Sequence, residues 1–185
     1  ARLLTLDESY RLRAGSACDF IDDGIKPVYR VVTALGREVK VTLSHPFLTI
    51  GGWQPLHQLN VGDRIGVPRQ LPVFGSEEPA DAKVKVLAYL LADGKAAADQ
   101  GVPELVFRMT RAKIALFLEQ LFARDGRNYL LSTGQTGLSY TTVSKKLARD
   151  VQHLLLRFGI LAEFRTRPVE RQGIPILAYE LRVDD

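Results

Sequence analysis

The alternation of apolar and polar residues in the first part of the chain predicts short β-strands. Residues 28–33 are rich in β-branched and aromatic side chains, and residues 38–43 alternate with a period of two, as a half-buried strand does. The short turn between them makes the pair a predicted hairpin. Further short strands are expected at 47–50 and 61–68, with one helical turn at 55–59. Several short strands separated by Gly, Pro and Asn indicate a compact all-β domain.

After residue 80 the apolar positions change to helical spacing. Residues 82–92 and 111–124 each read as a helix that ends at an Asp-Gly pair, in which Gly favours the helix end. A third helix is predicted from Ser144, a good N-cap residue, to Gly159. Paired strands are expected at 127–131 with 138–142 and at 161–166 with 176–183. Helices interleaved with hairpins predict a mixed second domain, and an α+β protein as a whole.

A segment of different composition separates the two patterns. Residues 72–80 contain two prolines, a Gly-Ser pair and two acids, and they show no apolar period. Such chemistry is typical of a linker. The predicted organisation is therefore a β domain at 1–72, a linker at 73–80 and a mixed domain at 81–185.

The charge distribution adds a difference between these domains. The 185 residues carry a net charge of +4, and all of this excess lies after residue 80, with 16 Lys and Arg against 12 Asp and Glu; residues 1–80 carry nine of each. A basic domain suits a polyanion such as DNA, but a solvated charged surface explains so modest an excess equally well. One cysteine and no apolar run near the roughly 18 residues of a membrane span favour a globular protein of the reducing cytoplasm.

One cluster in the first domain is suited to chemistry. Thr42 ends a predicted strand, and His45 follows three residues later, at the bend that Pro46 imposes. A hydroxyl and an imidazole held together can hydrogen-bond a strained peptide and protonate its leaving nitrogen. The alternative, from the residues alone, is a structural Thr–His pair beside a turn.

The residues around this pair resemble the histidine-containing splicing block of inteins, the self-excising elements with the all-β hedgehog/intein (HINT) fold. The matching run is 36–49, followed by Gly52-Trp53 and 56–69, and residues 23–30 look most like inteins inserted in bacterial replicative DNA helicases. The resemblance implies that Thr42 and His45 activate the upstream splice-junction peptide for an acyl shift.

The resemblance also implies parts that this sequence does not contain. Inteins begin with a nucleophilic Cys or Ser and end with a His-Asn pair, whereas this sequence runs from Ala1 to Asp185 and its one thiol is the internal Cys18. We therefore expect a partial splicing domain that does not splice as it stands, and a Cys18 without a catalytic role.

Asp93 and Asp125 each follow a predicted apolar helix. Two such helices packed side by side would bring the acids together, where they repel unless divalent cations neutralise them. Oxygen ligands suit Mg²⁺, and paired metal ions suit phosphodiester hydrolysis. The alternative is that each Asp-Gly pair only ends its helix.

The same two helices resemble the motifs of LAGLIDADG homing endonucleases, which often lie inside inteins. The matching segments are 86–94 and 118–126, and the helix after Ser144 looks like the segment that follows them. The resemblance implies αββαββα units whose β-sheets bind duplex DNA. It also implies Asp93 and Asp125 as catalytic Mg²⁺ ligands, with Lys145 or Lys146 as a basic catalytic residue.

Two departures from the family pattern lower the expected activity. Gln120 and Arg124 occupy positions where the family packs small residues, so the helices or their carboxylates are expected to shift. Only 16 residues, 95–110, separate the first Asp-Gly pair from the next helix, although two hairpins need about 25 or more. We therefore expect an abridged endonuclease domain.

The overall prediction is a fragment of a monomeric, cytoplasmic intein. The parent intein would excise itself from a host protein, a replicative DNA helicase, and would cleave double-stranded DNA with Mg²⁺. One alternative is a degenerate endonuclease domain that only binds DNA or supports the splicing fold. Another is a LAGLIDADG-type transcription regulator, which the intein-like first 70 residues disfavour. The basic side chains expected to contact DNA phosphates are Arg108, Arg111, Lys113, Arg127, Arg165 and Arg167.

Overall fold

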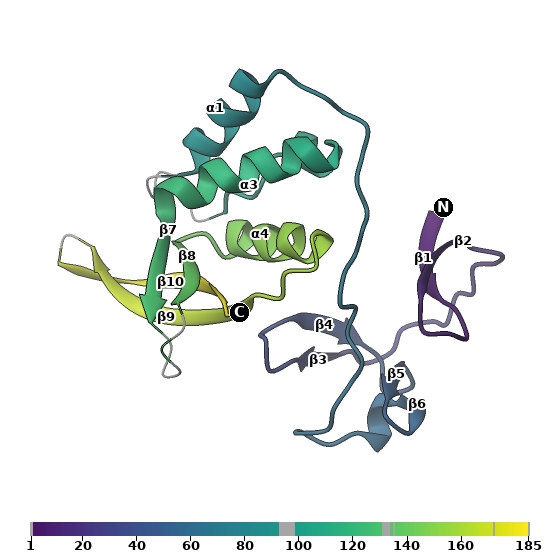
Figure 1. Cartoon of the computed structure of the whole chain (residues 1–185). Helices are drawn as coiled ribbons and strands as arrows, with labels where there is room; N and C mark the ends of the chain where they lie inside the picture. The colour runs from purple at the N-terminus through teal and green to yellow at the C-terminus, as the bar shows by residue number, and fades with distance from the viewer. Residues whose placement is uncertain (1, 93–98, 131–133, 135, 172, 185) are drawn as a thin grey trace. The chain divides into compact units, whose positions relative to one another are not determined.

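Two structural units make up the chain in the computed structural model (Figure 1), which describes residues 2–92, 99–130, 134, 136–171 and 173–184. The first unit comprises Ala1–Val31 and Glu38–Val67. The second comprises Pro68–Asp185 together with Val32–Arg37, a short segment from within the first unit's sequence. Helices and strands are both present, which confirms the predicted α+β class.

Paired strands and one 3₁₀ turn build the first unit. The pairs are β1 (Arg2–Leu6) with β2 (Leu12–Ser16), β3 (Tyr29–Val32) with β4 (Glu38–Val41), and β5 (Pro46–Thr49) with β6 (Gly52–Pro55). The turn η1 covers Leu56–Gln58, as the sequence predicts. Among the described residues of this unit, Val41 is the one buried apolar side chain, because separate two-stranded hairpins have little to pack against.

The prediction of a strand at 61–68 is wrong. There, Ile65 makes only an isolated bridge to Thr49. The backbone turns instead: the amide of Asp63 donates to the Asn60 carbonyl at 3.1 Å, and Gly62 has a φ of 105°. That left-handed conformation interrupts an extended run, and the apolar alternation alone did not reveal it.

A four-stranded antiparallel sheet and four helices build the second unit. The sheet order is β7-β8-β10-β9, with strands Gly126–Leu130, Thr136–Thr142, Ile174–Val183 and Glu163–Arg171 respectively. The helices are α1 (Asp81–Leu91), α2 (Glu104–Phe107), α3 (Arg111–Asp125) and α4 (Lys145–Arg157). Three of these helices and both hairpins match the sequence predictions, and the four-residue α2 is an addition.

Local chemistry explains where two of the helices begin and end. The Ser144 side chain accepts a hydrogen bond from the Leu147 amide and so caps α4. Gly126 ends α3, but with an ordinary φ of −71°. A Cβ at that position would lie 2.3 Å from the Phe122 carbonyl oxygen, so the close approach of the backbone requires glycine here.

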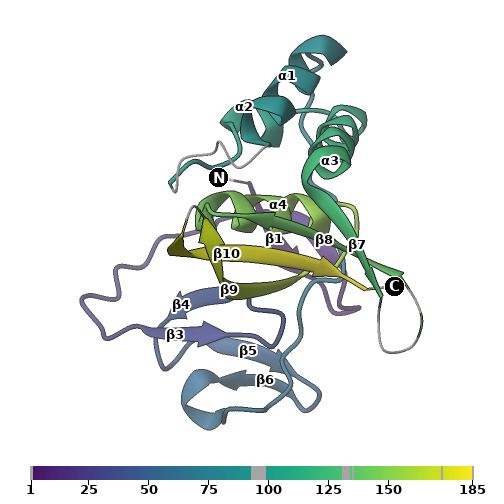
Figure 2. The same ribbon diagram turned by 90° about the vertical axis from the view of Figure 1, so that its left-hand side faces the viewer.

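The core of the second unit lies between its sheet and its helices. Helix α4 contacts β8, β9 and β10, and α3 contacts β7 and β8, on one side of the sheet (Figures 1 and 2). The sheet contributes the buried Tyr140 and Leu181 to this core. The helices contribute Val84, Ala88, Leu91, Ile114, Phe117, Leu118, Leu121, Leu147, Val151, Leu154 and Leu155.

The stretch of linker composition lies along the second unit. The Gly75 amide donates a hydrogen bond to the Met109 carbonyl at 3.0 Å, and the Thr110 amide donates one to the Glu77 carbonyl at 3.0 Å. The Phe74 ring meets the Phe158 ring edge-on, with centroids 5.4 Å apart. Among the residues that the structure describes, no helix is both long enough and apolar enough to cross a membrane.

Candidate nucleic-acid interface and splicing residues

Helices α1 and α3 run in the same direction. Near their N-terminal ends, Lys113 of α3 forms an ion pair with Asp81 of α1. Near their C-terminal ends, the Arg124 guanidinium lies 4.0 Å from the centroid of the Tyr89 ring. The negative ends of the two helix dipoles therefore lie at the same end of the pair, where a cation is stabilised.

The side chains near the contact between α1 and α3 differ in how deeply they are buried. Ala88 is completely buried, as expected for a small residue at a close helix contact. Arg124 is exposed and extends over Tyr89, and Gln120 is partly buried. The long Arg124 side chain is thus directed outward, which leaves the helix contact to the smaller residues.

Asp125 is the last residue of α3 and is partly buried. In the next strand pair, Gly126 of β7 lies opposite Tyr140 of β8, whose ring centroid is 5.5 Å from that of Phe122. Burial raises the pKa of Tyr140 far above its usual range, and the charge of Asp125 acts in the same direction. Asp125 therefore adjoins a buried phenol in a setting of low dielectric.

The hydroxyl of Tyr140 is a second polar group at this end of α3. It meets no partner with hydrogen-bond geometry among the described residues, although the Thr142 side chain slightly offsets the rise in its pKa. Buried polar groups without partners are uncommon and cost stability. No sequence pattern singled out Tyr140, apart from its place in an alternating strand.

The other predicted catalytic residues are only partly described. Asp93 lies outside the described residues. Lys145 and Lys146 are exposed in the first turn of α4, and a Cβ on Gly101 would come within 2.8 Å of the Lys146 Cε atom. The N-terminus of α4 therefore lies against Gly101.

Within the described part of the chain, no three His, Cys, Asp or Glu side chains gather as a metal cage. A Mg²⁺ site does not need such a cage, because Mg²⁺ keeps several waters and binds one or two carboxylates together with substrate phosphates. The carboxylate of Asp125, at the negative end of two parallel helix dipoles, fits this kind of site.

The register of the sheet places four arginines on its face away from the helices. Directly opposed residues of antiparallel strands share a face, and residues two apart along a strand share it too. Since Tyr140 and Leu181 face the core, their sequence neighbours point the other way. The arginines of this open face are Arg127, Arg165, Arg167 and Arg182.

Acidic residues partly balance the charge of this open face. Arg165 pairs with Glu163 at 2.8 Å, and Arg182 pairs with Glu180 at 3.2 Å. The Arg165 side chain is still 49% exposed, and Arg127 and Arg167 are exposed as well. Accessible guanidinium groups on a twisted sheet suit a backbone of phosphates.

A tyrosine and its acidic partner complete one edge of the open face. The Tyr129 hydroxyl donates to the Asp184 carboxylate, and the Arg182 guanidinium lies 4.9 Å from the Tyr129 ring centroid. Burial and the Asp184 carboxylate raise the pKa of Tyr129 to about 12. Arg182 was not among the basic residues predicted to contact DNA, although the period-two pattern of the predicted strand 176–183 places it on the face away from Leu181.

The remaining predicted DNA contacts lie elsewhere. Lys113 pairs with Asp81, Arg111 lies 5.6 Å from the Phe158 ring centroid, and Arg108 pairs with Glu104 at 3.6 Å. These groups lie at or just before the N-terminus of α3, about 20 Å from Asp125 at a rise of about 1.5 Å per residue. The structure thus separates the predicted basic residues into a sheet group and a helix-end group.

Thr42 and His45 lie in one tight turn of the first unit. The His45 amide donates to the Thr42 carbonyl at 3.1 Å, and the Thr42 hydroxyl lies 3.2 Å from that of Ser44. The His45 ring is exposed and meets Phe47 edge-on at 5.3 Å. The turn therefore holds the two predicted splicing residues as neighbours.

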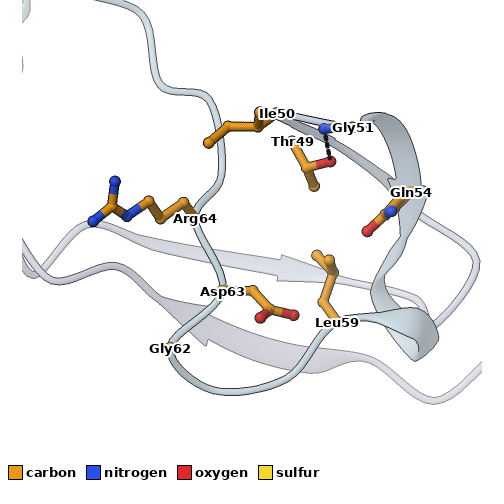
Figure 3. A pocket seen from close by; sticks show the side chains of 8 residues that line it. All are labelled: Thr49, Ile50, Gly51, Gln54, Leu59, Gly62, Asp63 and Arg64. Atoms are coloured by element: carbon orange, nitrogen blue, oxygen red, sulfur yellow. Dashed lines mark hydrogen bonds between the residues drawn. The ribbon is translucent and has the colours of Figure 1, made fainter.

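A shallow hollow of about 380 Å³ lies in the same unit (Figure 3). The Thr49 hydroxyl, which accepts a hydrogen bond from the Gly51 amide, and the exposed Arg64 lie at its rim. Its lining includes neither Thr42 nor His45. The hollow is thus distinct from the predicted splicing residues.

Comparisons with known proteins agree with the arrangement of the second unit. A family model described as a LAGLIDADG-like domain matches residues 112–184, which run from α3 through β10. The replicative DNA helicase DnaB of Rhodothermus marinus is 27% identical over 234 residues, covering 86% of this chain and 25% of the relative. The chain therefore spans about a quarter of that relative's length.

Two further relatives have names from DNA replication and topology. The replication factor C small subunit of Thermococcus kodakarensis is 35% identical over 100 residues, covering 51% of this chain and 11% of the relative. A DNA gyrase protein of Mycobacterium leprae is 37% identical over 70 residues, covering 38% of this chain and 6% of the relative. This chain is thus similar to parts of three differently named proteins.

Proposed function

The chain carries a LAGLIDADG-like domain in residues 112–184, and on this premise we propose that it is part of an intein with a DNA-cleaving homing endonuclease. Similarity to parts of a helicase, a replication factor and a gyrase supports an element inserted into different host proteins. The proposed host is a replicative DNA helicase, and the proposed setting is the cytoplasm. We propose a monomer as the active form.

The observation that carries the endonuclease proposal is the arginine-bearing open face of the sheet. Arg127, Arg165, Arg167 and Arg182 would bind phosphates of duplex DNA across β7, β8, β10 and β9. Their contacts would fix the position of the duplex without reading its sequence. Arg108, Arg111 and Lys113 lie at or just before the N-terminus of α3 and not on this face of the sheet, so we assign them no primary contact.

The proposed cleavage centre lies at the C-terminal ends of α1 and α3. Asp93 and Asp125 would hold Mg²⁺, which supplies charge neutralisation at the phosphate and a water of lowered pKa. The chain's own contribution would be the parallel packing of α1 and α3, whose C-terminal ends lie at the same end of the pair. The buried Tyr140 near Asp125 would lower the local dielectric, which would strengthen electrostatic interactions with the phosphate.

The proposed splicing function belongs to Thr42 and His45. The Thr42 hydroxyl would hydrogen-bond the strained splice-junction peptide, and the His45 imidazole would protonate its leaving nitrogen. A backbone hydrogen bond joins the two residues in one turn, and the His45 ring is exposed, which supports a shared peptide substrate. Excision also needs the terminal nucleophiles of a complete precursor.

A degenerate domain that binds DNA without cleaving it is the second candidate function. Gln120 favours it, because this long, partly buried side chain occupies a position of α3 where the family pattern has a small residue. Both candidates use the open face of the sheet, so DNA binding tests what they share. Cleavage then distinguishes them.

Salt-dependent DNA binding tests the proposed interface. We expect the double variant Arg165→Ala/Arg167→Ala to lower the slope of log affinity against log salt by about 2, since each lost phosphate contact removes about 0.9. Fluorescence anisotropy with a labelled duplex at several salt concentrations measures this slope.

A matched double variant controls for the change in net charge. Lys83→Ala/Arg108→Ala also removes two exposed cations from the second unit, but from its helices. Its slope should equal that of the unchanged protein. Equal slopes for the two double variants would refute the assignment of the sheet as the DNA-binding surface.

A further inference from the structure

Residues Val32–Arg37 are held in the second unit by a polar socket, which consists of Arg149 and Gln152 of α4 and Phe164 of β9. The Leu35 carbonyl accepts from the Phe164 amide at 3.0 Å and from the Gln152 side-chain amide at 3.2 Å. Leu35 and Gln152, which lie 117 residues apart in sequence, are thereby joined through one carbonyl group.

The neighbouring residues of the segment add further hydrogen bonds. The Gly36 carbonyl accepts from the Arg149 guanidinium. In the opposite direction, the Arg37 guanidinium donates to the Gln152 carbonyl at 3.2 Å. The socket therefore recognises the backbone of a turn and the arginine that follows it.

Internal contacts orient the side chains of the socket. Gln152 is only 2% exposed, and its amide also donates to the Ala162 carbonyl at 2.8 Å. Arg149 donates to the Gln152 side-chain oxygen at 3.3 Å, and its guanidinium lies 3.7 Å from the Phe164 ring centroid. A buried polar network of this kind is favourable only while all its members have partners.

The segment also protects an edge of the sheet. β9 is an outer strand, so the amides on its free side have no strand partner within the sheet. The Phe164 amide donates to the Leu35 carbonyl. Uncovered edges of this kind promote pairing with other chains, and natural sheets cover them with loops or helices.

The shape of the turn depends on Gly36. Its φ of 76° is left-handed, and a Cβ there would lie 2.6 Å from the Phe164 carbonyl oxygen. The turn is closed by the Gly36 amide donating to the Thr33 carbonyl at 2.8 Å and by the Arg37 amide donating to the Thr33 hydroxyl at 3.1 Å. The turn is thus pre-shaped for the socket.

We propose that α4 and β9 form a receptor for the Leu35-Gly36-Arg37 turn, and that the second unit is complete only when this turn occupies the socket. The inference goes beyond DNA cleavage and splicing, because it concerns which residues constitute the second unit. A second unit that lacks Val32–Arg37 loses the hydrogen bonds from Gln152 to Leu35 and from Arg149 to Gly36, and it opens the edge of β9.

Amide hydrogen exchange in the full chain, followed by NMR, tests the receptor at single-residue resolution. The Phe164 amide should be protected in the unchanged protein. Gly36→Ala should speed its exchange by about tenfold or more, because the added methyl group clashes with the Phe164 carbonyl. Amides of the β8–β10 ladder should keep their protection, since the sheet interior is unchanged.

Gly173→Ala is the matched control. Gly173 has a φ of 78°, yet a Cβ there meets nothing within 4 Å, so this variant carries the same backbone strain without a clash. It should leave the Phe164 amide protected. An unprotected Phe164 amide in the unchanged protein, or equal effects of the two alanine variants, would overturn the proposal.

A second variant covers the case in which Gly36→Ala also unfolds the sheet. Arg149→Met keeps a long side chain but removes the hydrogen bond to the Gly36 carbonyl. Faster hydrogen exchange of the Phe164 amide, with an intact β8–β10 ladder, supports the proposed receptor. Unchanged exchange at Phe164 contradicts it.

Discussion

At the scale of single residues, Thr42 and His45, for which we propose splicing roles, lie in one turn. Their connection is a backbone hydrogen bond between the His45 amide and the Thr42 carbonyl. The Thr42 hydroxyl approaches Ser44, and the His45 ring contacts Phe47, so each functional group has its own neighbour within the turn. We infer that a bound peptide would complete the arrangement.

Splicing of a complete precursor should depend on the His45 imidazole. We expect His45→Ala to slow splicing by about 10²–10⁴-fold, the usual contribution of a positioned acid or base. Unspliced precursor would then accumulate on a gel. His57→Ala is the control: His57 is exposed, and its ring nitrogen lies 3.2 Å from the Leu43 carbonyl in the same region. Normal splicing of His45→Ala would exclude His45 from the mechanism.

At the scale of elements, side chains along α4 form hydrogen bonds with several other segments of the second unit. Its N-cap, Ser144, also donates to the Gln100 carbonyl at 2.6 Å, and Asp150 accepts from the Val102 amide at 2.9 Å. Arg149 and Gln152 form the socket, and Arg157 donates to the Phe107 carbonyl at 2.8 Å. The helix thus holds three segments that are distant in sequence.

His153 makes this helix sensitive to pH. Burial lowers the pKa of His153, and the positive charges of Arg157 and Arg37 lower it further, while Asp150 acts in the opposite direction. Arg157 donates to a His153 ring nitrogen at 3.4 Å, which requires an unprotonated nitrogen. The folded protein therefore binds the His153 proton less readily than the unfolded chain does.

Stability should consequently fall as the pH falls from about 6.5 through the lowered pKa of His153. We expect the melting temperature to drop by at least about 2 °C between about pH 7.5 and about pH 5.5, a change on the scale of about 1 kcal/mol for a chain of this size. Far-ultraviolet circular dichroism reports on it, because the described α-helices all belong to the second unit.

The control is His153→Gln, which retains an acceptor for Arg157 but does not titrate. Burial raises the pKa of Asp150, which makes stability change with pH in the opposite sense, but Asp150 is present in both proteins. The difference between the two melting curves therefore isolates His153. An equal fall in the variant would contradict its assigned role.

At the scale of the whole molecule, local patterns predicted the elements well and long-range contacts poorly. Periodicity and the Ser144 cap were sufficient to predict α1, α3 and α4, since helices are stabilised by neighbours three or four residues apart. The prediction of a strand at 61–68 failed because the left-handed backbone conformation of Gly62 interrupts the extended run that the alternating pattern indicated.

The candidate site was predicted to a lesser extent. The sequence pointed to Asp125 and to three arginines of the sheet, but it could not distinguish them from the helix-end group, because the register of paired strands decides the face. The socket for Val32–Arg37 had no local signal at all. Its contacts join residues more than 100 positions apart, which no periodicity within one segment can reveal.

We propose that the second unit cleaves DNA and that Asp125 lies in its cleavage centre. The decisive measurement is Mg²⁺-dependent cleavage of a plasmid that carries the host gene without its insertion. We expect linear product from the unchanged protein, and a rate at least about 100-fold lower for Asp125→Asn and Asp93→Asn. Each variant removes a carboxylate that would hold Mg²⁺, and with it the charge neutralisation that the ion supplies at the phosphate.

Glu119→Gln removes the same charge from an exposed position on the same helix, and it should cleave at the parental rate. Cleavage by Asp125→Asn that matches the parent and Glu119→Gln would contradict the assignment of Asp125. Absence of cleavage by the parent, with DNA binding retained, would establish the degenerate binding domain instead.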